Sequence, residues 1–178
     1  MLFCQVGGSG NHSTLCFSRL LVIFFCTLFS AAPVFLHFQC GTMGSRLNFV
    51  SWNVKGLNHP VKRRKVLSHI KQFKAAVVFL QETHLRDSDN SRLMSRWAGQ
   101  HFHSTFQAKA RGVSILIDQN IPFEEHNVIS DTSGRYVFVS GKLCNTKVVL
   151  ANIYAPDIDN VAFFQRAFSL LPDLSSYS

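Results

Sequence analysis

Three short segments of this sequence place polar side chains directly after apolar runs. They are residues 51–56 (SWNVKG), 81–84 (QETH) and 152–156 (NIYAP). Each follows residues with the apolar, β-branched composition of a buried strand. In an open α/β sheet, the exits of such strands usually present the chemistry of the protein. The spacing therefore predicts one polar site assembled from three strand exits.

The residue types in these segments suit the hydrolysis of a phosphodiester by a metal ion. That reaction requires neutralisation of phosphoryl charge, an oriented water and a base. Glu82 follows the apolar run 75–80 and is a candidate metal ligand, because Mg²⁺ often uses only one or two carboxylates. Asn53 offers a neutral amide to a metal-bound water or a phosphate oxygen, and Tyr154 offers a phenolic donor. The alternatives are a solvated strand-end glutamate, an Asx-type turn at Asn53 and a packed aromatic ring at position 154.

Four further residues are candidates for supporting the site or binding substrate. Asn152 lies two positions before Tyr154 and so faces the same side of its strand. His84 is either exposed or DNA-facing. Lys62 and Arg63 open the basic run 62–65 (KRRK), which is either a solvated helix face or a stripe that follows phosphates.

The charge balance favours a polyanionic partner. The 178 residues carry a formal net charge of +8, and the pI is near 9.6. This balance suits nucleic acid or an acidic membrane surface. Four of the five cysteines precede residue 43, and Cys144 is the only one after it. A lone cysteine forms no internal disulfide, so residues 43–178 are predicted to be a reduced, intracellular domain.

Residues 1–42 differ in composition from the rest and are expected to form a hydrophobic extension to a domain at 43–178. They contain one charged residue, Arg19, and an apolar run at 20–29 followed by SAAP. This pattern resembles a signal peptide, and it is too short for a membrane helix of about 20 residues. A working signal or anchor would place the protein in the secretory pathway or a membrane. A spurious extension before Met43 is favoured, since no Asn-x-Ser/Thr acceptor or cysteine pair follows; a membrane partner is not expected.

Apolar periodicity predicts alternating strands and helices that position the three segments. A proline opens the first predicted helix, where its missing N–H costs nothing. The last helix is expected to begin at Asp159 or Asn160 and to present an apolar face. The predicted strands are 47–52, 75–80, 113–118, 135–140 and 146–154, the last two forming a hairpin; the predicted helices are 60–73, a short one from Asp89 or Asn90 to Trp97, and the C-terminal one.

Four segments resemble, in the right order, the endonuclease/exonuclease/phosphatase superfamily. They are 47–70 (LNFVSWNVKGLNHPVKRRKVLSHI), 77–85 (VVFLQETHL), 111–117 (RGVSILI) and 148–156 (VVLANIYAP). The likeness is greatest to the endonuclease domain of LINE-type (non-LTR) retrotransposons, a branch related to exonuclease III-like abasic-site endonucleases. The resemblance implies the N-terminal half of a DNase I-like, four-layer α/β sandwich with mixed sheets.

The same resemblance implies the chemistry of the site. It assigns Asn53, Glu82 and Tyr154 to catalysis, with Glu82 and Asn53 at a Mg²⁺ (or Mn²⁺) ion. DNA is then the expected partner, the nucleus the expected location, and no small-molecule cofactor is expected.

Two motifs of the resembled family do not occur in this sequence. The Gly-Asp-Phe-Asn segment supplies an Asp and an Asn that stabilise the transition state, and the Ser-Asp-His segment supplies the general-base histidine. We therefore expect a truncated domain that is inactive alone. A sheet without its partner would expose side chains such as Val78, Ile115 and Leu150, which predicts self-association. The alternatives are a fragment of an abasic-site repair nuclease, a non-catalytic nucleic-acid binder and a pseudogene product.

Overall fold

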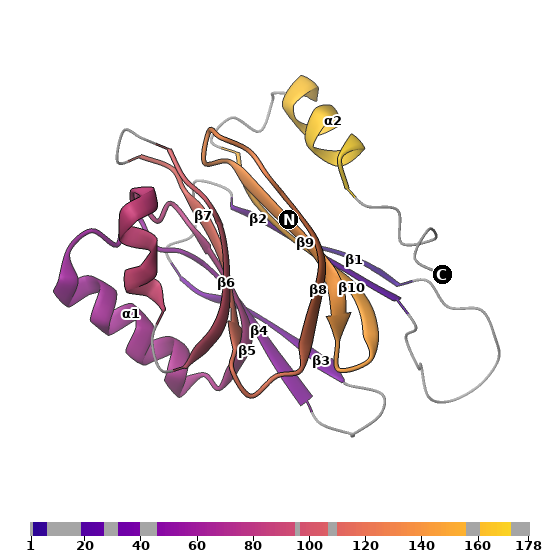
Figure 1. Ribbon diagram of the computed structural model, residues 1–178, viewed down its shortest axis with the longest axis horizontal. Coiled ribbons are helices and arrows are strands. Elements are labelled where there is room, and N and C mark those ends of the chain that lie inside the picture. Colours follow the sequence, from indigo (N-terminus) through magenta and orange to yellow (C-terminus); the bar gives the residue numbers. More distant parts are fainter. Residues whose placement is uncertain are drawn as a thin grey trace.

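A computed structural model describes residues 2–6, 19–26, 32–39, 46–94, 97–106, 110–155 and 161–171, the first two segments by backbone alone. Two five-stranded sheets pack face to face. In Figure 1, helix α1 lies outside one sheet and helix α2 outside the other. The protein thus has four layers, and the predicted α/β sandwich is confirmed.

Each sheet contains parallel and antiparallel pairs, as the prediction of mixed sheets requires. The strand orders are β3-β4-β5-β7-β6 in one sheet and β1-β2-β10-β9-β8 in the other. The parallel pairs are β4 with β5 and β10 with β2. The elements are β1 Leu2–Val6, β2 Arg19–Cys26, β3 Val34–Gln39, β4 Arg46–Asn53, α1 Pro60–Gln72, β5 Ala75–Gln81, the 3₁₀ helix η1 Asp87–Leu93, β6 Ala98–Ser104, β7 Val113–Asp118, β8 Phe123–Ser130, β9 Tyr136–Leu143, β10 Thr146–Tyr154 and α2 Val161–Ser169.

The main core lies between the two sheets. Phe49, Phe79 and Ile115 of the first sheet pack there with Val139 and Leu150 of the second, and all five are at most 1% exposed. Strand β5 is buried along its whole length, because α1 covers one face and the second sheet covers the other. A strand covered on both faces needs the continuous apolar run seen in its sequence.

Helix α1 connects the parallel strands β4 and β5 and begins with Pro60 at its first turn, as predicted. Val66 and Ile70 are buried against the first sheet. Phe73 caps the helix, and Lys74 then adopts a φ of +48°, which turns the chain into β5. The predicted strands and the β9–β10 hairpin are also confirmed.

The short helix predicted from Asp89 or Asn90 to Trp97 is wrong in type and extent. The chain forms η1 at Asp87–Leu93 without a side-chain cap, and then the edge strand β6. Strand β8 at the edge of the other sheet was also not predicted. Its residues from Glu124 to Val128 are exposed, so the strand carries no apolar alternation that the sequence could reveal. Asp159 and Asn160 lie outside the described residues.

Residues from the expected extension 1–42 pair with both sheets. Strand β2 lies parallel to β10, with Val22 opposite Leu150. Strand β3 lies antiparallel to β4, with Leu36 opposite Phe49. The apolar run at 20–29 therefore supplies a strand through Cys26, while the boundary at residue 43 stays a prediction.

The expected exposure of an unpaired sheet face is wrong. Val78, Ile115 and Leu150 are each 0% exposed. Ile115 and Leu150 lie between the two sheets, whereas Val78 packs under α1. The predicted self-association through this face thus loses its physical basis, because the second sheet already covers it. Among the described helices, none has the length and apolarity needed to cross a bilayer.

Candidate active site

The layer between the sheets changes from apolar to polar toward one end. On β4, the inward positions run from Phe49 to Ser51 and Asn53; on β5, Gln81 follows Phe79; and on β10, Asn152 follows Leu150. These polar side chains are nearly fully buried, with Asn152 0% exposed and Gln81 1% exposed. The three predicted segments therefore meet at the same end of the sandwich.

Glu82 and Asn53 form the centre of this site. The Asn53 Nδ2 atom donates to Glu82 Oε1 at 3.0 Å, and the backbone N–H of Lys55 donates to Asn53 Oδ1 at 3.1 Å. Because a backbone N–H can only donate, it fixes which end of the amide faces Glu82. Asn53 thus orients one oxygen of the carboxylate, and the Glu82 side chain remains 13% exposed.

The other Glu82 oxygen faces His84. His84 Nε2 lies 3.6 Å from Glu82 Oε2, and the His84 side chain is 29% exposed. The structure therefore brings together Asn53, Glu82 and His84. His84 stands at the mouth of the site rather than in its buried part.

The loop after β4 continues the pairing with β5 beyond the strand ends. Gly56 N donates to Glu82 O at 2.7 Å, and Leu57 N donates to Thr83 O at 2.8 Å. Lys62 Nζ binds the carbonyl of Lys55 at 2.8 Å, and Arg63 binds that of Leu57 at 3.0 Å. Lys62 and Arg63 thus hold the loop that orients Asn53. They act on Glu82 indirectly, through this loop.

The backbone around Glu82 adopts an uncommon conformation. Four non-glycine residues near the site have positive φ: Lys55 at 46°, Glu82 at 53°, His84 at 54° and Arg111 at 58°. The left-handed region costs an ordinary residue about 1–2 kcal/mol. Such residues cluster at active sites, where the surrounding structure holds them in place.

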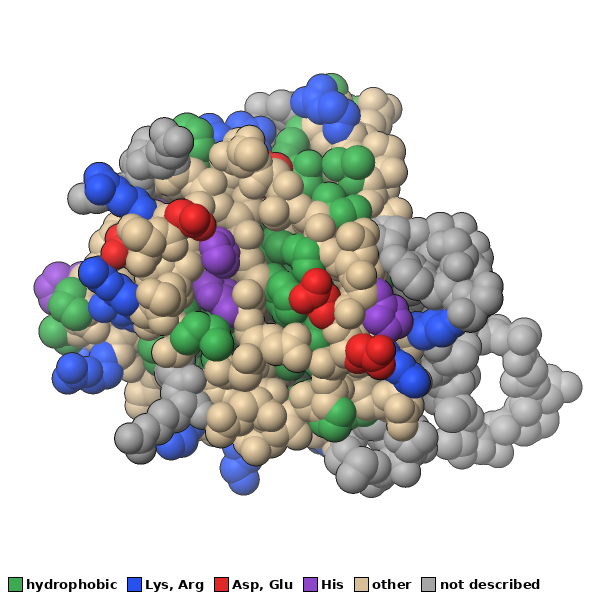
Figure 2. All heavy atoms as spheres, viewed as in Figure 1, with side chains coloured by type: hydrophobic (Ala, Val, Ile, Leu, Met, Phe, Trp, Pro, Cys, Tyr) green, Lys and Arg blue, Asp and Glu red, His purple; other side chains and the backbone are tan. Residues whose placement is uncertain are grey.

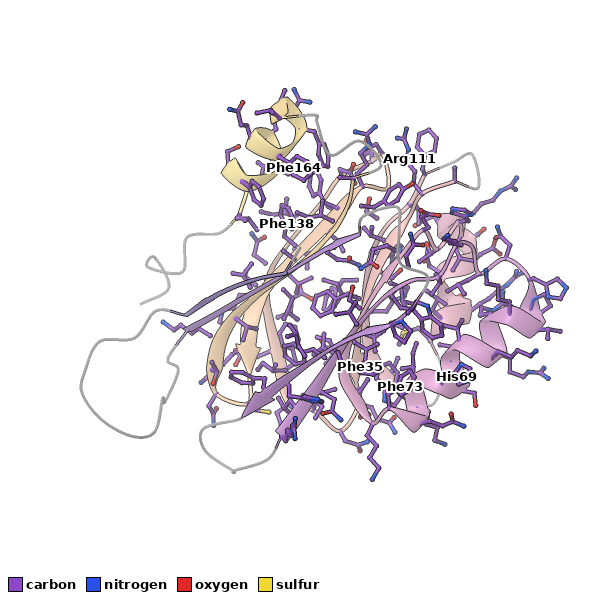
Figure 3. The ribbon with its side chains drawn as sticks, turned by 180° about the vertical axis from the view of Figure 1, so that it is seen from behind. Phe35, His69, Phe73, Arg111, Phe138 and Phe164 are labelled. Carbon is purple, nitrogen blue, oxygen red and sulfur yellow. The ribbon has the colours of Figure 1, made fainter. Side chains whose placement is uncertain are left out.

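Strand β7 begins beside these residues and closes one side of the site. Thr83 N donates to Gly112 O at 3.0 Å, and His84 N donates to Arg111 O at 2.8 Å. Gly112 has a φ of +91°, and a Cβ there would lie 2.4 Å from the Thr83 hydroxyl oxygen. Only glycine fits this close approach. Figure 3 shows Arg111 at this end of the molecule, opposite the end that carries Phe73.

Asn152 joins the two sheets beneath the site. Its Nδ2 donates to the carbonyls of Leu80 and Ser114, both at 2.9 Å, and its Oδ1 accepts from Gln81 Nε2 at 2.7 Å. Gln81 also donates to the Ser51 hydroxyl at 3.0 Å. Asn152 therefore acts on Glu82 through Gln81, the residue before it, and does not contact Glu82 by any of these bonds.

Tyr154 reaches the same end of the sandwich from the second sheet. Its side chain is 8% exposed and contributes to the inter-sheet core, and its N–H donates to Arg135 O at 2.6 Å. The packed ring that was the alternative interpretation is thus present. The phenolic role in binding phosphate stays a prediction.

The donor set at Glu82 fits an ion that needs few protein ligands. The described residues contain no cluster of three or more His, Cys, Asp or Glu side chains arranged to hold a metal. Mg²⁺ keeps several waters and binds through one or two carboxylates, so a single partly exposed carboxylate suits it. Zinc sites usually take three or four protein ligands from Cys, His and carboxylate side chains, and the described residues around Glu82 do not form such a set.

Residues 50–175 match the family model described as the Endonuclease/Exonuclease/phosphatase family. This chain belongs to that family. The match spans the strands and loops that carry Asn53, Glu82 and Asn152, and it confirms the superfamily resemblance seen in the sequence. The roles of individual site residues stay predictions.

Three relatives show what this family member is similar to. The "Transposon TX1 uncharacterized 149 kDa protein" of Xenopus laevis is 25% identical over 132 residues, which cover 73% of this chain and 10% of that protein. A crystal structure of TDP2 from Caenorhabditis elegans has a TM-score of 0.51 at 22% identity, covering 69% of this chain and 40% of that one. D. rerio TDP2 complexed with a single-strand DNA product has a TM-score of 0.52 at 19% identity, covering 71% and 56%.

These likenesses show the fold, and this chain spans only part of each relative. It covers about a tenth of the transposon protein and roughly half of the TDP2 chains.

Sequence reasoning did not single out Gln81 or Gly112 as parts of the site. Gln81 belongs to the 81–84 motif, and a glutamine that ends a buried strand requires a buried partner. The sequence therefore indicates that Gln81 has a buried partner. It does not identify that partner as Asn152, which lies 71 positions away. The role of Gly112 depends on its approach to Thr83, which no sequence pattern records.

Proposed function

We propose that this chain carries the Glu82-centred part of a Mg²⁺-dependent DNA endonuclease site. The observation that carries the proposal is the Asn53–Glu82 hydrogen bond at two adjacent strand exits. It presents one oriented, partly exposed carboxylate at the end of a rigid sheet. Family membership supports phosphate-ester hydrolysis as the reaction class, although fold alone does not fix the substrate.

The residues of the site divide the work of such a reaction. Glu82 would hold the metal ion, and Asn53 would keep the carboxylate turned toward it. Mg²⁺, when bound, supplies positive charge to the phosphoryl oxygens. Tyr154 would donate a hydrogen bond to the phosphate, while Asn152 and Gln81 fix the strand ends. His84 lies at the mouth, where the DNA backbone would enter.

DNA is the proposed substrate because three observations point the same way. The chain carries a net charge of +8, it is similar to a transposon protein, and a structural neighbour is named as a complex with a single-strand DNA product. A retrotransposon-type endonuclease is therefore favoured over other phosphodiesterases of the family. We expect the protein in the nucleus, where a fluorescent fusion would show it.

We further propose that these 178 residues do not hydrolyse DNA alone. The described residues around Glu82 offer no buried histidine paired with an aspartate to activate water. Loss of one stabilising group in such a site typically costs about 3 kcal/mol of transition-state energy, or a hundredfold in rate. Two or three missing groups would bring the rate below detection.

Plasmid nicking tests the reaction. The full chain, the Glu82→Gln variant and the matched control Glu125→Gln, an exposed residue of β8, are incubated with supercoiled DNA in Mg²⁺ or EDTA. We expect no nicking above that of Glu82→Gln. Nicking that needs both Mg²⁺ and Glu82 would support the nuclease and overturn the inactivity. Preference for a duplex with an abasic site would then identify a repair-type enzyme.

Metal binding tests the site independently of turnover. Mn²⁺ serves as the probe, because its electron paramagnetic resonance signal falls on binding. We expect binding by the wild-type chain and by Glu125→Gln, and loss of binding in Glu82→Gln. Equal binding by all three proteins would refute the proposed metal ligand, whatever the nicking assay shows.

A further inference from the structure

A groove of about 980 Å³ runs along one side of helix α1. Of the residues that line it, Arg63 also supports the loop of the Glu82 site. Its helical lining comes from positions 60, 63, 64, 67, 68 and 71, the spacing of a single face of an α-helix. Its other wall includes the start of β4, the start of β5, Trp97 and the turn at 118–121. With 13 residues, α1 makes this side about 20 Å long.

The groove is strongly basic. Five of its lining residues are cations, and Asp118 is its one acid. Asp118 is engaged by the backbone N–H and the side-chain amide of Asn120. Within the described part of the chain, no salt bridge neutralises any of the five cations. The five cations are Arg46, Arg63, Arg64, Lys71 and Lys74.

Concentrated positive charge of this kind is costly to the folded protein, because like charges on one helix repel each other. Helix α1 has no acid in its first turn, and its sequence PVKRRKVLSHIKQ contains none elsewhere. Figure 2 shows lysine and arginine side chains over the part of the surface where Figure 1 places α1. The charge is thus not balanced by any acid of the helix, and Arg63 alone of the five cations is also bonded to the site loop.

The groove extends to the end of the first sheet opposite the active site. Arg46 begins β4 and Ala75 begins β5, whereas Asn53 and Glu82 stand where these strands finish. Seven residues of a strand span about 23 Å. A ligand at this end of the groove would therefore contact the protein well away from Glu82.

We infer that this groove binds the phosphate backbone of a nucleic acid. Arginine and lysine side chains along about 20 Å of helix match a regular polyanion, because one strand of duplex DNA carries a phosphate about every 3.4 Å along the axis. The groove is also lined by Asn48, Trp97, Gln119 and Asn120. The side-chain amides of Asn48 and Asn120 already donate within the protein. Cationic side chains beside an aromatic residue are typical of the lining of a nucleic-acid channel.

This proposal rests on the proposed function only for the identity of the nucleic acid, which is DNA. With a second contact of this kind, a nuclease would bind DNA at a distance from the metal site. This binding would not require the metal. An acidic polypeptide is the competing ligand, and the test separates the two.

Binding is measured by fluorescence anisotropy of a labelled 20-nucleotide duplex, in EDTA, with the full chain at several salt concentrations. The groove variant Arg64→Gln/Lys71→Gln/Lys74→Gln changes three exposed side chains. The control variant Lys142→Gln/Lys147→Gln/Arg166→Gln removes the same charge from the second sheet and α2. Glu82→Gln is the third protein.

We expect the groove variant to bind roughly tenfold to a hundredfold more weakly, and its slope of log K against log salt to fall by about 2–3. The control and Glu82→Gln should keep the wild-type slope. An equal loss in the control would show that net charge alone matters and would overturn the site. Competition by polyglutamate as strong as that by DNA at equal charge would overturn the nucleic-acid assignment.

A second readout uses the unmodified protein and so does not depend on the folding of any variant. Bound DNA should slow acetylation of Lys71 and Lys74 at least threefold and leave Lys142 and Lys147 unchanged. Unprotected groove lysines at saturating DNA would refute the proposal even if the active site proves correct.

Discussion

Replacing Asn152 with alanine tests whether the buried polar network holds the two sheets together. Asn152 is 0% exposed, and its three hydrogen bonds all reach residues of the other sheet: Leu80, Ser114 and Gln81. Its inward position between Leu150 and Tyr154 keeps the amide away from bulk solvent. The substitution therefore removes the donor and acceptor while their partners stay buried.

The expected loss follows from counting those partners. A buried polar group without a partner costs about 1–3 kcal/mol. Gln81 keeps its bond to Ser51, so the two carbonyls carry most of the penalty. We expect Asn152→Ala to lower the free energy of unfolding by about 3–5 kcal/mol. Ser51→Ala removes one bond of the same network and should cost about 1 kcal/mol.

Urea unfolding at pH 7, followed by tryptophan fluorescence and circular dichroism, measures these changes. Asn127→Ala is the matched control, since it makes the same chemical change on an exposed position of β8. It should shift stability by less than 0.5 kcal/mol. If Asn152→Ala loses less than 1 kcal/mol, or no more than the control, the network does not join the sheets as described.

Three further predictions concern the fold. Lys74→Gly should raise stability by about 1 kcal/mol in thermal melts, because φ is +48° there, whereas the helical control Gln72→Gly should lower it by about as much. Leu150→Ala should cost about 3–5 kcal/mol in urea, because its side chain is 0% exposed, and a loss below 1 kcal/mol would refute the inter-sheet core. Burial, and then the charge of His103, lowers the pKa of His101 from its ordinary 6.5 to about 3. Below pH 6.5 the unfolded chain therefore binds a proton at His101 that the folded protein does not bind. Lowering the pH from 6.5 should reduce the free energy of unfolding by up to about 1.4 kcal/mol per pH unit. His101→Gln should remove this pH dependence.

The parts of the fold that could be predicted from the sequence are those with at least one buried face. Residues 75–80 form a continuous apolar run because α1 and the second sheet both cover β5. The spacing of Val66 and Ile70 predicts α1 for a similar reason, because one face of the helix packs on the sheet. Burial imposes a pattern on sequence, and so these elements could be read from it.

The missed strands lie at sheet edges, where burial imposes no pattern. Strand β8 has exposed residues from Glu124 to Val128, and its pairing with β9 depends on backbone bonds that any residue can make. Strand β6 begins after a 3₁₀ helix whose charged residues resemble the start of an α-helix. Packing of the second sheet was missed for a different reason: β2 comes from residues that read as a signal-like extension.

The proximity of Asn53 and Glu82 was predictable from the sequence, and the detailed geometry around them was not. Adjacent parallel strands bring Asn53 and Glu82 to one edge, so their proximity followed from the fold. The direction of the Asn53 amide depends on Lys55 N–H, and the backbone of Glu82 depends on its contacts with Gly56 and β7. Such details arise from tertiary contacts that a local pattern does not contain.

The position of the Glu82 carboxylate is therefore set by the packing of the two sheets as much as by its own loop. Gln81 is bound to the second sheet through Asn152, and the next residue takes a left-handed conformation that is unfavourable by itself. A change at Asn152 should release both constraints together, so metal binding at Glu82 and global stability should fall in the same variant. Weakened Mn²⁺ binding by Asn152→Ala under conditions where the protein is still folded would show that the cross-sheet bonds position the carboxylate, whereas unchanged binding would assign that task to Asn53 alone.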